Sequence, residues 1–133
     1  MNKRIPLAVQ EVQEQYTVAL QKLYEKNDLE SIFFLRIAAE TGLRMRDIYD
    51  LKPSEIIVRK IYKKSLKTGK YEDYPLISEE TGRIAEQLVE RQGRFFSKDY
   101  LYYITEIKRQ FSNPNMRLLY IVSYKRTVGK KIM

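Results

Sequence analysis

The chain has 133 residues, 44% of them hydrophobic and 32% charged, so it can form one folded domain, residues 1–133, but not two. It contains no cysteine and no histidine, which excludes disulfides, thiolate metal sites and catalysis by histidine. The net charge of +8 favours an acidic partner, and with neither a signal peptide nor a run of roughly 18 apolar residues we expect a cytoplasmic protein with no metal or cofactor.

The first half of the chain predicts three helices. Apolar residues recur at helical spacing in an amphipathic segment that should end near Lys26. Asp28 can cap a second helix over residues 29–40, which is apolar enough to be mostly buried, and Gly42 should end it in a left-handed conformation. A short third helix is expected over residues 45–51.

The middle of the chain predicts a β-hairpin. Residues 56–62 are rich in β-branched side chains and alternate imperfectly between apolar and charged, which indicates a strand. A turn signal at residues 67–70 and an extended segment at residues 71–77 complete a hairpin or a three-stranded meander, with Pro75 at an edge.

The rest of the chain predicts helices again. Ser78 should cap a helix that closes at Gly93, Ser97 should cap another, and a last amphipathic helix is expected over residues 115–126, with Leu119, Val122 and Met116 inward. The inward-facing residues of the helix after Ser97 should be Tyr100, Leu101, Ile104, Ile107 and Phe111. The expected fold class is therefore mainly α with a small antiparallel β-sheet, an α+β domain.

Positive charge is concentrated in two parts of the chain. Residues 107–133 contain no acid and seven bases, which are Lys108, Arg109, Arg117, Lys125, Arg126, Lys130 and Lys131. The predicted hairpin carries Arg59, Lys60, Lys63, Lys64, Lys67 and Lys70. Segregated positive charge favours a polyanion, because neutralising phosphates releases condensed counterions. The alternative is a solvated surface that keeps the chain soluble.

Three motifs occur in a fixed order along this pattern. An apolar helix delivers Thr41-Gly42-Leu43-Arg44, and Asp47 opens the next helix. Leu66-Lys67-Thr68-Gly69-Lys70 and Tyr74-Pro75-Leu76-Ile77 follow in the predicted hairpin, and Pro114-Asn115-Met116-Arg117 comes last. This order resembles the catalytic domain of the tyrosine recombinases, or phage integrases, with their T-G-x-R turn, lysine-bearing hairpin and H-x-x-R motif.

The resemblance implies that family's fold and assigns roles to three cations. In the family's metal-free reaction a tyrosine attacks a DNA phosphate, and two arginines, here Arg44 and Arg117, hold its non-bridging oxygens. A lysine, here Lys67, protonates the leaving 5′ oxygen. Asp47 would buttress Arg44. The structural alternative for Arg44 is an ion pair with Asp47 or Glu40.

Parts of the family's machinery have no counterpart in this sequence. Pro114 stands where H-x-x-R has its histidine, the chain has no histidine or tryptophan for a later family position, and only 16 residues follow Arg117. The nucleophilic tyrosine segment and the family's amino-terminal DNA-encircling domain are therefore expected to be missing. We expect a DNA-binding regulator or accessory factor of a phage or mobile element that does not recombine DNA unaided.

Two other functions remain open at this point. One is a fragment of an active tyrosine recombinase, which exchanges strands through a 3′-phosphotyrosine intermediate. The other is a basic helical interaction domain in which T-G-L-R occurs by chance.

The expected partner is duplex DNA, contacted through its phosphates rather than its bases. No membrane or small-molecule substrate is expected, and homo-oligomerisation on DNA is left open. Arg44, Lys67 and Arg117 form the family-matched catalytic set, or its remnant if activity is lost. The expected DNA-contacting residues are Arg44, Arg46, Arg59, Lys60, Lys63, Lys64, Lys67, Lys70, Arg117, Lys125 and Arg126.

Overall fold

The computed structural model describes residues 6–129 and contains mainly helices with one two-stranded antiparallel sheet, which confirms the predicted α+β class. In chain order the elements are α1 (Val9–Glu25), α2 (Leu29–Thr41), α3 (Met45–Tyr49), the 3-10 turn η1 (Pro53–Glu55), β1 (Ile56–Ile57), β2 (Lys60–Ile61), α4 (Glu79–Gln92), α5 (Tyr100–Gln110), α6 (Leu118–Ser123) and the π-helical turn η2 (Tyr124–Gly129). Within these residues, no helix has both the length and the apolar composition needed to span a membrane.

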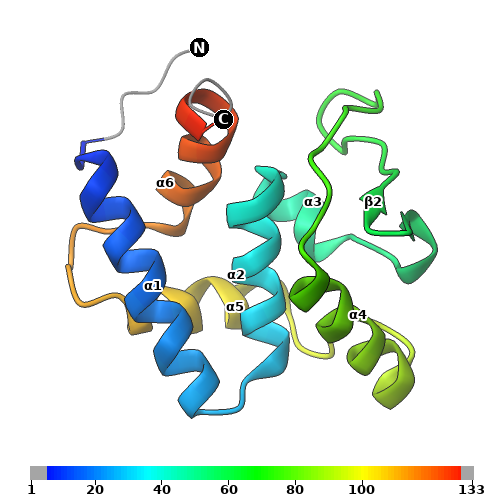
Figure 1. The fold of residues 1–133 in the computed structure, drawn as a ribbon, viewed down its shortest axis with the longest axis horizontal. Helices are drawn as coiled ribbons and strands as arrows, with labels where there is room; N and C mark the ends of the chain where they lie inside the picture. The colour runs from blue at the N-terminus through cyan, green and yellow to red at the C-terminus, as the bar shows by residue number, and fades with distance from the viewer. Residues whose placement is uncertain (1–5, 130–133) are drawn as a thin grey trace.

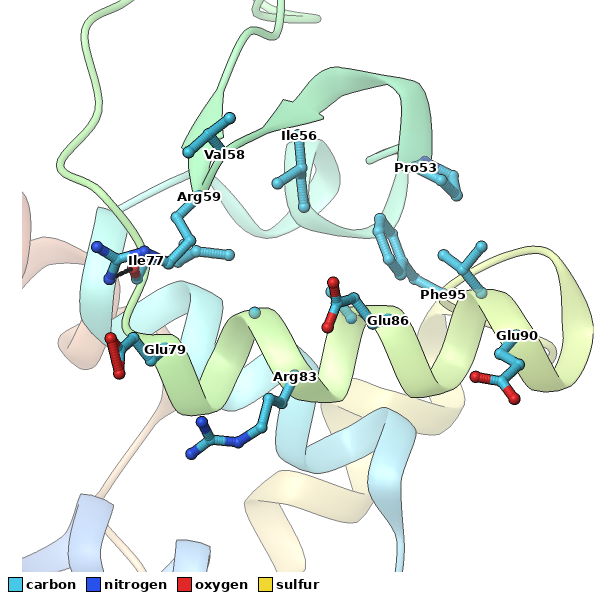
Figure 2. Close-up of a pocket in the computed structure, with 13 residues that line it drawn as sticks. Pro53, Ile56, Val58, Arg59, Ile77, Glu79, Arg83, Glu86, Glu90 and Phe95 are labelled. Carbon is cyan, nitrogen blue, oxygen red and sulfur yellow. Dashed lines mark hydrogen bonds between the residues drawn. The ribbon is translucent and has the colours of Figure 1, made fainter.

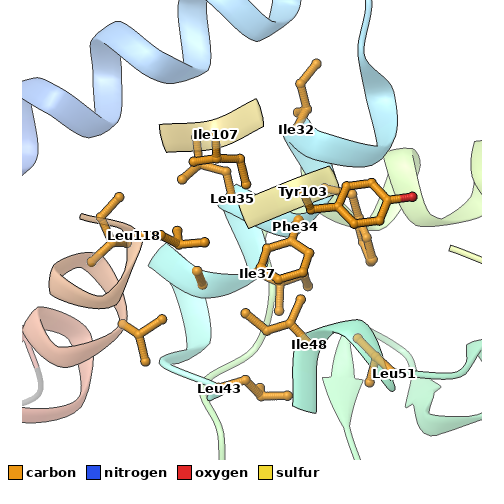
Figure 3. Packing of buried hydrophobic residues seen from close by; sticks show 14 of the residues in the cluster. Ile32, Phe34, Leu35, Ile37, Leu43, Ile48, Leu51, Tyr103, Ile107 and Leu118 are labelled. Atoms are coloured by element: carbon orange, nitrogen blue, oxygen red, sulfur yellow. The ribbon is translucent and has the colours of Figure 1, made fainter. Parts of the chain in front are cut away.

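Helix α2 is the centre of the domain. It lies between α1 and α6 on one side and α4 on the other, and it also packs against α5 (Figure 1). Eight of its 13 side chains are buried and the other five are half-buried, as expected of a mainly apolar helix at the centre of a domain. Phe34 packs against Tyr103 of α5, and Ile37 and Ile48 of α3 belong to the same buried cluster (Figure 3). Each large apolar side chain buried this way contributes about 1.5–3 kcal/mol.

The predicted helix boundaries around α2 and α4 are confirmed, with one correction further along. The carboxylate of Asp28 accepts a hydrogen bond from the Ser31 N–H at 3.2 Å, and Gly42 ends α2 with a left-handed φ of 73°. The residue that caps α5 is Asp99, which accepts from the Tyr102 N–H at 2.9 Å, rather than Ser97. Ser97 is held instead by the carboxylate of Glu30, because its N–H and its hydroxyl both donate to it at 2.7 Å.

The predicted continuous strand over residues 56–62 is wrong, because the chain reverses within it. Ile56 pairs with Ile61, and Val58 and Arg59 form the turn between the two strands with positive φ values of 47° and 64°. Residues 71–77 form no strand in the described part of the chain and contribute a single bridge, Lys64 with Tyr71. A β-branched run predicts extended backbone, and it does not reveal a reversal that lacks glycine or asparagine.

The carboxy-terminal helices also differ from the prediction. Leu101 was expected to face inward but is 67% exposed, whereas Tyr103, three residues after the start of α5, is fully buried. The predicted helix over residues 115–126 begins only at Leu118 and changes to π-helical geometry at Tyr124. Met116 and Val122 are buried as predicted, whereas Leu119 is only half-buried.

Candidate nucleic-acid interface

Arg44 and Lys67, the two best-matched cations of the sequence analysis, line one hollow of about 450 Å³. Arg46 lines it as well, and its apolar walls come from Met45, Leu66, Tyr100, Leu119 and Val122. The hollow lies where the turn between α2 and α3 meets the loop after β2 and helix α6. Tertiary packing therefore brings residues 23 positions apart in the sequence to one concave, positively charged place.

Arg44 is positioned by the end of α2. Gly42 terminates that helix, and Arg44 then adopts an extended conformation as the residue that precedes α3. Its Nη1 donates to Oε2 of Glu72 at 3.0 Å and lies 3.5 Å from the Ser65 hydroxyl. Arg44 is therefore ion-paired with Glu72.

The predicted alternative partners of Arg44 are engaged elsewhere. The carboxylate of Glu40 accepts from the Ser78 N–H at 2.8 Å and from the Thr81 hydroxyl at 2.7 Å, which ties α2 to the start of α4. Oδ1 of Asp47 accepts from the Leu66 N–H at 2.9 Å. No ion pair joins Arg44 to either acid among the described residues.

Asp47 holds the lysine-bearing loop. Its bond to Leu66 anchors the loop next to Lys67, and the hydroxyl of the buried Ser65 accepts from the N–H groups of Lys67 and Thr68 at 3.2 and 3.3 Å. The expected buttress of Arg44 therefore positions the neighbouring lysine instead. The other carboxylate oxygen of Asp47 is buried with no hydrogen-bond partner.

The second arginine beside Arg44 is Arg126, on the π-helical turn η2. Its Nη2 donates to Oε1 of Glu72 at 3.1 Å, and its Nη1 donates to the carbonyl oxygen of Gly42 at 3.0 Å. A side chain at position 42 would have its Cβ 2.8 Å from Cγ of Arg126, so the glycine of T-G-L-R also provides the space in which Arg126 lies. One carboxylate, that of Glu72, thus bridges two arginines.

Arg117 occupies a different place from the one its family match implies. It precedes α6 and lines a separate hollow of about 410 Å³ with Lys108, Pro114 and Tyr120. Arg117 and Arg126 lie at opposite ends of the continuous segment formed by α6 and η2, and it is the Arg126 end that reaches Gly42. The structure therefore does not bring Arg117 together with Arg44 and Lys67.

The charge state of Glu72 follows from these contacts. Burial acts to raise the pKa of its carboxyl, but the hydrogen bond from Arg44 and the positive charge of Arg126 outweigh burial and hold the pKa below its ordinary value. Glu72 is therefore ionised between the two arginines at neutral pH.

Two tyrosines lie at this site, and both have a raised pKa. The guanidinium of Arg46 stacks 4.1 Å from the centroid of the Tyr100 ring. Burial raises the pKa of Tyr100, and Arg46 only partly opposes it. Burial, followed by the negative charges of Glu72 and Asp47, raises the pKa of Tyr74. An activated phenolic nucleophile requires the opposite shift.

Two of the expected DNA-contacting lysines are buried, which corrects the prediction for them. Nζ of Lys63 lies 2.7 Å from Oδ2 of Asp50 and 3.8 Å from Oε1 of Glu55, and its side chain is 3% exposed. Lys125 is also buried. Both are removed from a surface that phosphates can reach, because the amphipathic pattern of residues 60–64 and 118–126 turns these positions inward.

The other basic residues are at least partly exposed. Lys64, Lys67 and Lys70 are exposed on the loop after β2, and Arg46 is exposed on α3. Arg59 donates to the carbonyl oxygen of Ile77 at 3.0 Å, and Lys60 donates to that of Tyr74 at 2.7 Å and pairs with Asp73. These two bonds hold the loop against the hairpin. Lys130 and Lys131 lie outside the described residues.

A third hollow, of about 580 Å³, lies between the β1–β2 hairpin and α4 (Figure 2). Its walls are largely apolar, with Ile56, Ile77 and Phe95, while Glu86 and Glu90 lie along its rim on α4. In its lining the acids Glu79, Glu86 and Glu90 outnumber the arginines Arg59 and Arg83, which disfavours a phosphate backbone. Within residues 6–129, no three acidic side chains gather closely enough to hold a metal ion.

Two features of the site do not follow from the sequence patterns. Glu72 carries no motif, and the only local signal for it is that an acid follows a run of loop lysines. Arg126 was expected to contact DNA, but nothing in the sequence pairs it with Arg44, since 82 residues separate them. Comparisons with protein-family models, with curated proteins and with solved structures find no match to this chain.

Proposed function

We propose that this chain binds duplex DNA by contacting phosphates at the hollow lined by Arg44, Arg46 and Lys67, and that it does so without exchanging strands. The observation that carries the proposal is that Arg44 and Lys67, taken from two separate sequence motifs, line the same hollow. Guanidinium groups suit phosphate oxygens because they stay charged and offer forked donors. In the cell, the protein would act as a regulator or accessory factor of a phage or mobile element.

The surrounding surface supports a phosphate backbone as the ligand. Exposed Lys64 and Lys70 lie on the same loop as Lys67 and extend the positive charge beyond the hollow. Contacts to phosphates carry no sequence information, so the binding should depend on charge and groove shape more than on base sequence.

The proposal includes a scaffold like that of the tyrosine recombinase catalytic domain, with its reaction lost. Three observations support the loss. Arg117 is not at the site, Pro114 replaces the histidine of H-x-x-R, and the pKa of each tyrosine at the site is raised rather than lowered. The retained cations would then serve to dock DNA.

The test is binding of a short, mixed-sequence, fluorescently labelled duplex measured by anisotropy over a range of salt concentrations. The Arg44→Gln variant should weaken binding on the order of tenfold and flatten the salt dependence by about one phosphate contact. The matched control is Arg91→Gln, which removes the same charge from the far end of α4 and should change affinity less than about twofold. An equal loss of duplex affinity in both variants, or no binding of the native chain at low salt, would overturn the proposal.

A suicide DNA substrate tests the claim that the chain does not exchange strands. Such a substrate traps a 3′-phosphotyrosine adduct if one forms, and we expect none. A reproducible adduct that disappears when one tyrosine is replaced by phenylalanine would establish the recombinase-fragment alternative instead.

A further inference from the structure

We propose that Arg44 and Arg126 form a two-arginine oxyanion site that Glu72 occupies in the free protein, and that a DNA phosphate must displace the Glu72 carboxylate to enter it. This rests on the proposed DNA-binding function and adds the identity of the second arginine and an internal competitor for the phosphate. The family resemblance assigns the second arginine to Arg117, not Arg126, and assigns no role to Glu72.

The bonding pattern at Glu72 is that of a bound oxyanion. Each of its two carboxylate oxygens accepts from a different guanidinium, Oε2 from Arg44 at 3.0 Å and Oε1 from Arg126 at 3.1 Å. A phosphodiester carries the same single negative charge on two non-bridging oxygens. It can therefore take over both hydrogen bonds without a rearrangement of the arginines.

The two arginines are held in place by contacts that do not depend on Glu72. Nη1 of Arg126 donates to the Gly42 carbonyl, and its aliphatic stem lies against the face of Gly42, where a side chain would clash. Arg44 is fixed by the turn between α2 and α3 and lies within reach of the Ser65 hydroxyl. The site thus remains assembled when the carboxylate leaves.

The carboxylate is open to solvent, and no helix or strand holds its backbone. The side chains of Glu72, Arg44 and Arg126 are 27%, 32% and 26% exposed, so a ligand reaches all three from outside. Glu72 lies in a segment without helix or strand, between Tyr71 and Pro75, and rotation of its side chain alone vacates the site. Without Glu72, two guanidiniums would face each other unneutralised, which explains why a carboxylate lies there in the absence of DNA.

The adjacent acid provides a matched control. Asp73 carries the same charge one residue away, but its side chain is 92% exposed and pairs with Lys60 rather than with either arginine. Replacing Glu72 by glutamine therefore changes the overall charge as Asp73→Asn does, and only the first change removes the competitor.

The experiment compares duplex affinity in the native chain, E72Q and D73N at the same salt concentration. E72Q should bind on the order of tenfold more tightly and D73N less than about twofold more tightly. In an Arg126→Gln background the advantage of E72Q over D73N should disappear, and thermal unfolding checks that each variant is folded. If E72Q binds the duplex no more tightly than D73N, the proposed competition between the Glu72 carboxylate and a DNA phosphate is overturned.

A second measurement separates this inference from the DNA function. Inorganic phosphate is titrated into E72Q and the native chain, and the guanidinium Nε–H signals of Arg44 and Arg126 are followed by NMR. Saturable shifts of both signals at lower phosphate concentration in E72Q support the oxyanion site even if no variant binds DNA. Absence of such shifts in E72Q overturns it, whatever the DNA result.

Discussion

Lys63 and Lys67 lie four residues apart in one basic segment, and the fold gives them different roles. The ammonium group of Lys63 is buried against Asp50, and it is the largest cause of the lowered pKa of that carboxyl, through a hydrogen bond. Lys67 is exposed and lines the hollow with Arg44. Residue type alone does not distinguish them, because a lysine contributes to stability or to binding according to its surroundings.

Replacing either lysine by methionine removes one charge. The change at position 63 should affect stability, and the change at position 67 should affect DNA binding. Lys63→Met removes the 2.7 Å bond to Asp50, which is left with Lys52 at 3.7 Å, and should lower the free energy of unfolding by about 2 kcal/mol, with duplex affinity unchanged. Lys67→Met should leave stability within about 0.5 kcal/mol and reduce the slope of log affinity against log salt by about 1. Urea denaturation and anisotropy measure the two effects, and a loss of affinity in Lys63→Met comparable to that in Lys67→Met would contradict this division.

At the scale of secondary-structure elements, Gly42 connects the end of α2 to the site. It adopts a left-handed conformation that ends the helix, and its missing side chain leaves room for Arg126. Gly93 ends α4 in nearly the same conformation, with φ of 76° against 73°, but nothing lies within 4 Å of the place where its Cβ would be. The two helix ends therefore differ only in their surroundings.

The pair of substitutions Gly42→Ala and Gly93→Ala isolates the packing contribution. Each substitution should lower the free energy of unfolding by about 1 kcal/mol, because alanine is strained in the left-handed region. Gly42→Ala should lower the free energy of unfolding by roughly a further 1–2 kcal/mol and weaken duplex binding, because the Cβ of the new alanine displaces Arg126. Thermal or urea unfolding of both variants gives the difference, and equal losses would show that Arg126 moves aside without cost.

At the scale of the whole molecule, the absence of histidine and cysteine shapes the response to pH. Burial acts to raise the pKa of Glu30, but hydrogen bonds from Tyr103 and Ser97 outweigh it and lower the pKa, as those from the arginines do for Glu72. Burial raises the pKa of Tyr16 to about 12. The groups with shifted pKa values thus lie at the two ends of the pH scale.

The free energy of unfolding should therefore be nearly constant from about pH 5.5 to 9. Carboxyls with a lowered pKa in the folded state stabilise it above their unfolded pKa, and this contribution is lost as pH falls below about 4.5. Tyrosines with a raised pKa stabilise it below about pH 10, and this is lost as pH rises further. Urea denaturation across this range checks the profile, and a step between pH 6 and 7 would contradict it.

Much of the helical fold was predictable because its signals are local. The caps at Asp28 and Ser78 and the helix ends at Gly42 and Gly93 depend on residues within one turn of each other, and all four are confirmed. The hairpin was not predictable in detail, because Val58 and Arg59 adopt a turn conformation that their residue types disfavour. Contacts such as the one between Arg59 and Ile77 hold that turn.

The sequence by itself determined the α+β class, the buried central helix and the turn that presents Arg44, since these follow from periodicity and capping along a continuous segment. DNA binding, which the sequence also predicts, stays a prediction. The tertiary structure alone decided that Arg126 rather than Arg117 lies beside Arg44, that Glu72 bridges the two arginines and that Lys63 is buried. The physical reason is that these contacts depend on how α6 and the loop after β2 pack around α2, and packing between distant segments leaves no periodic trace in the chain.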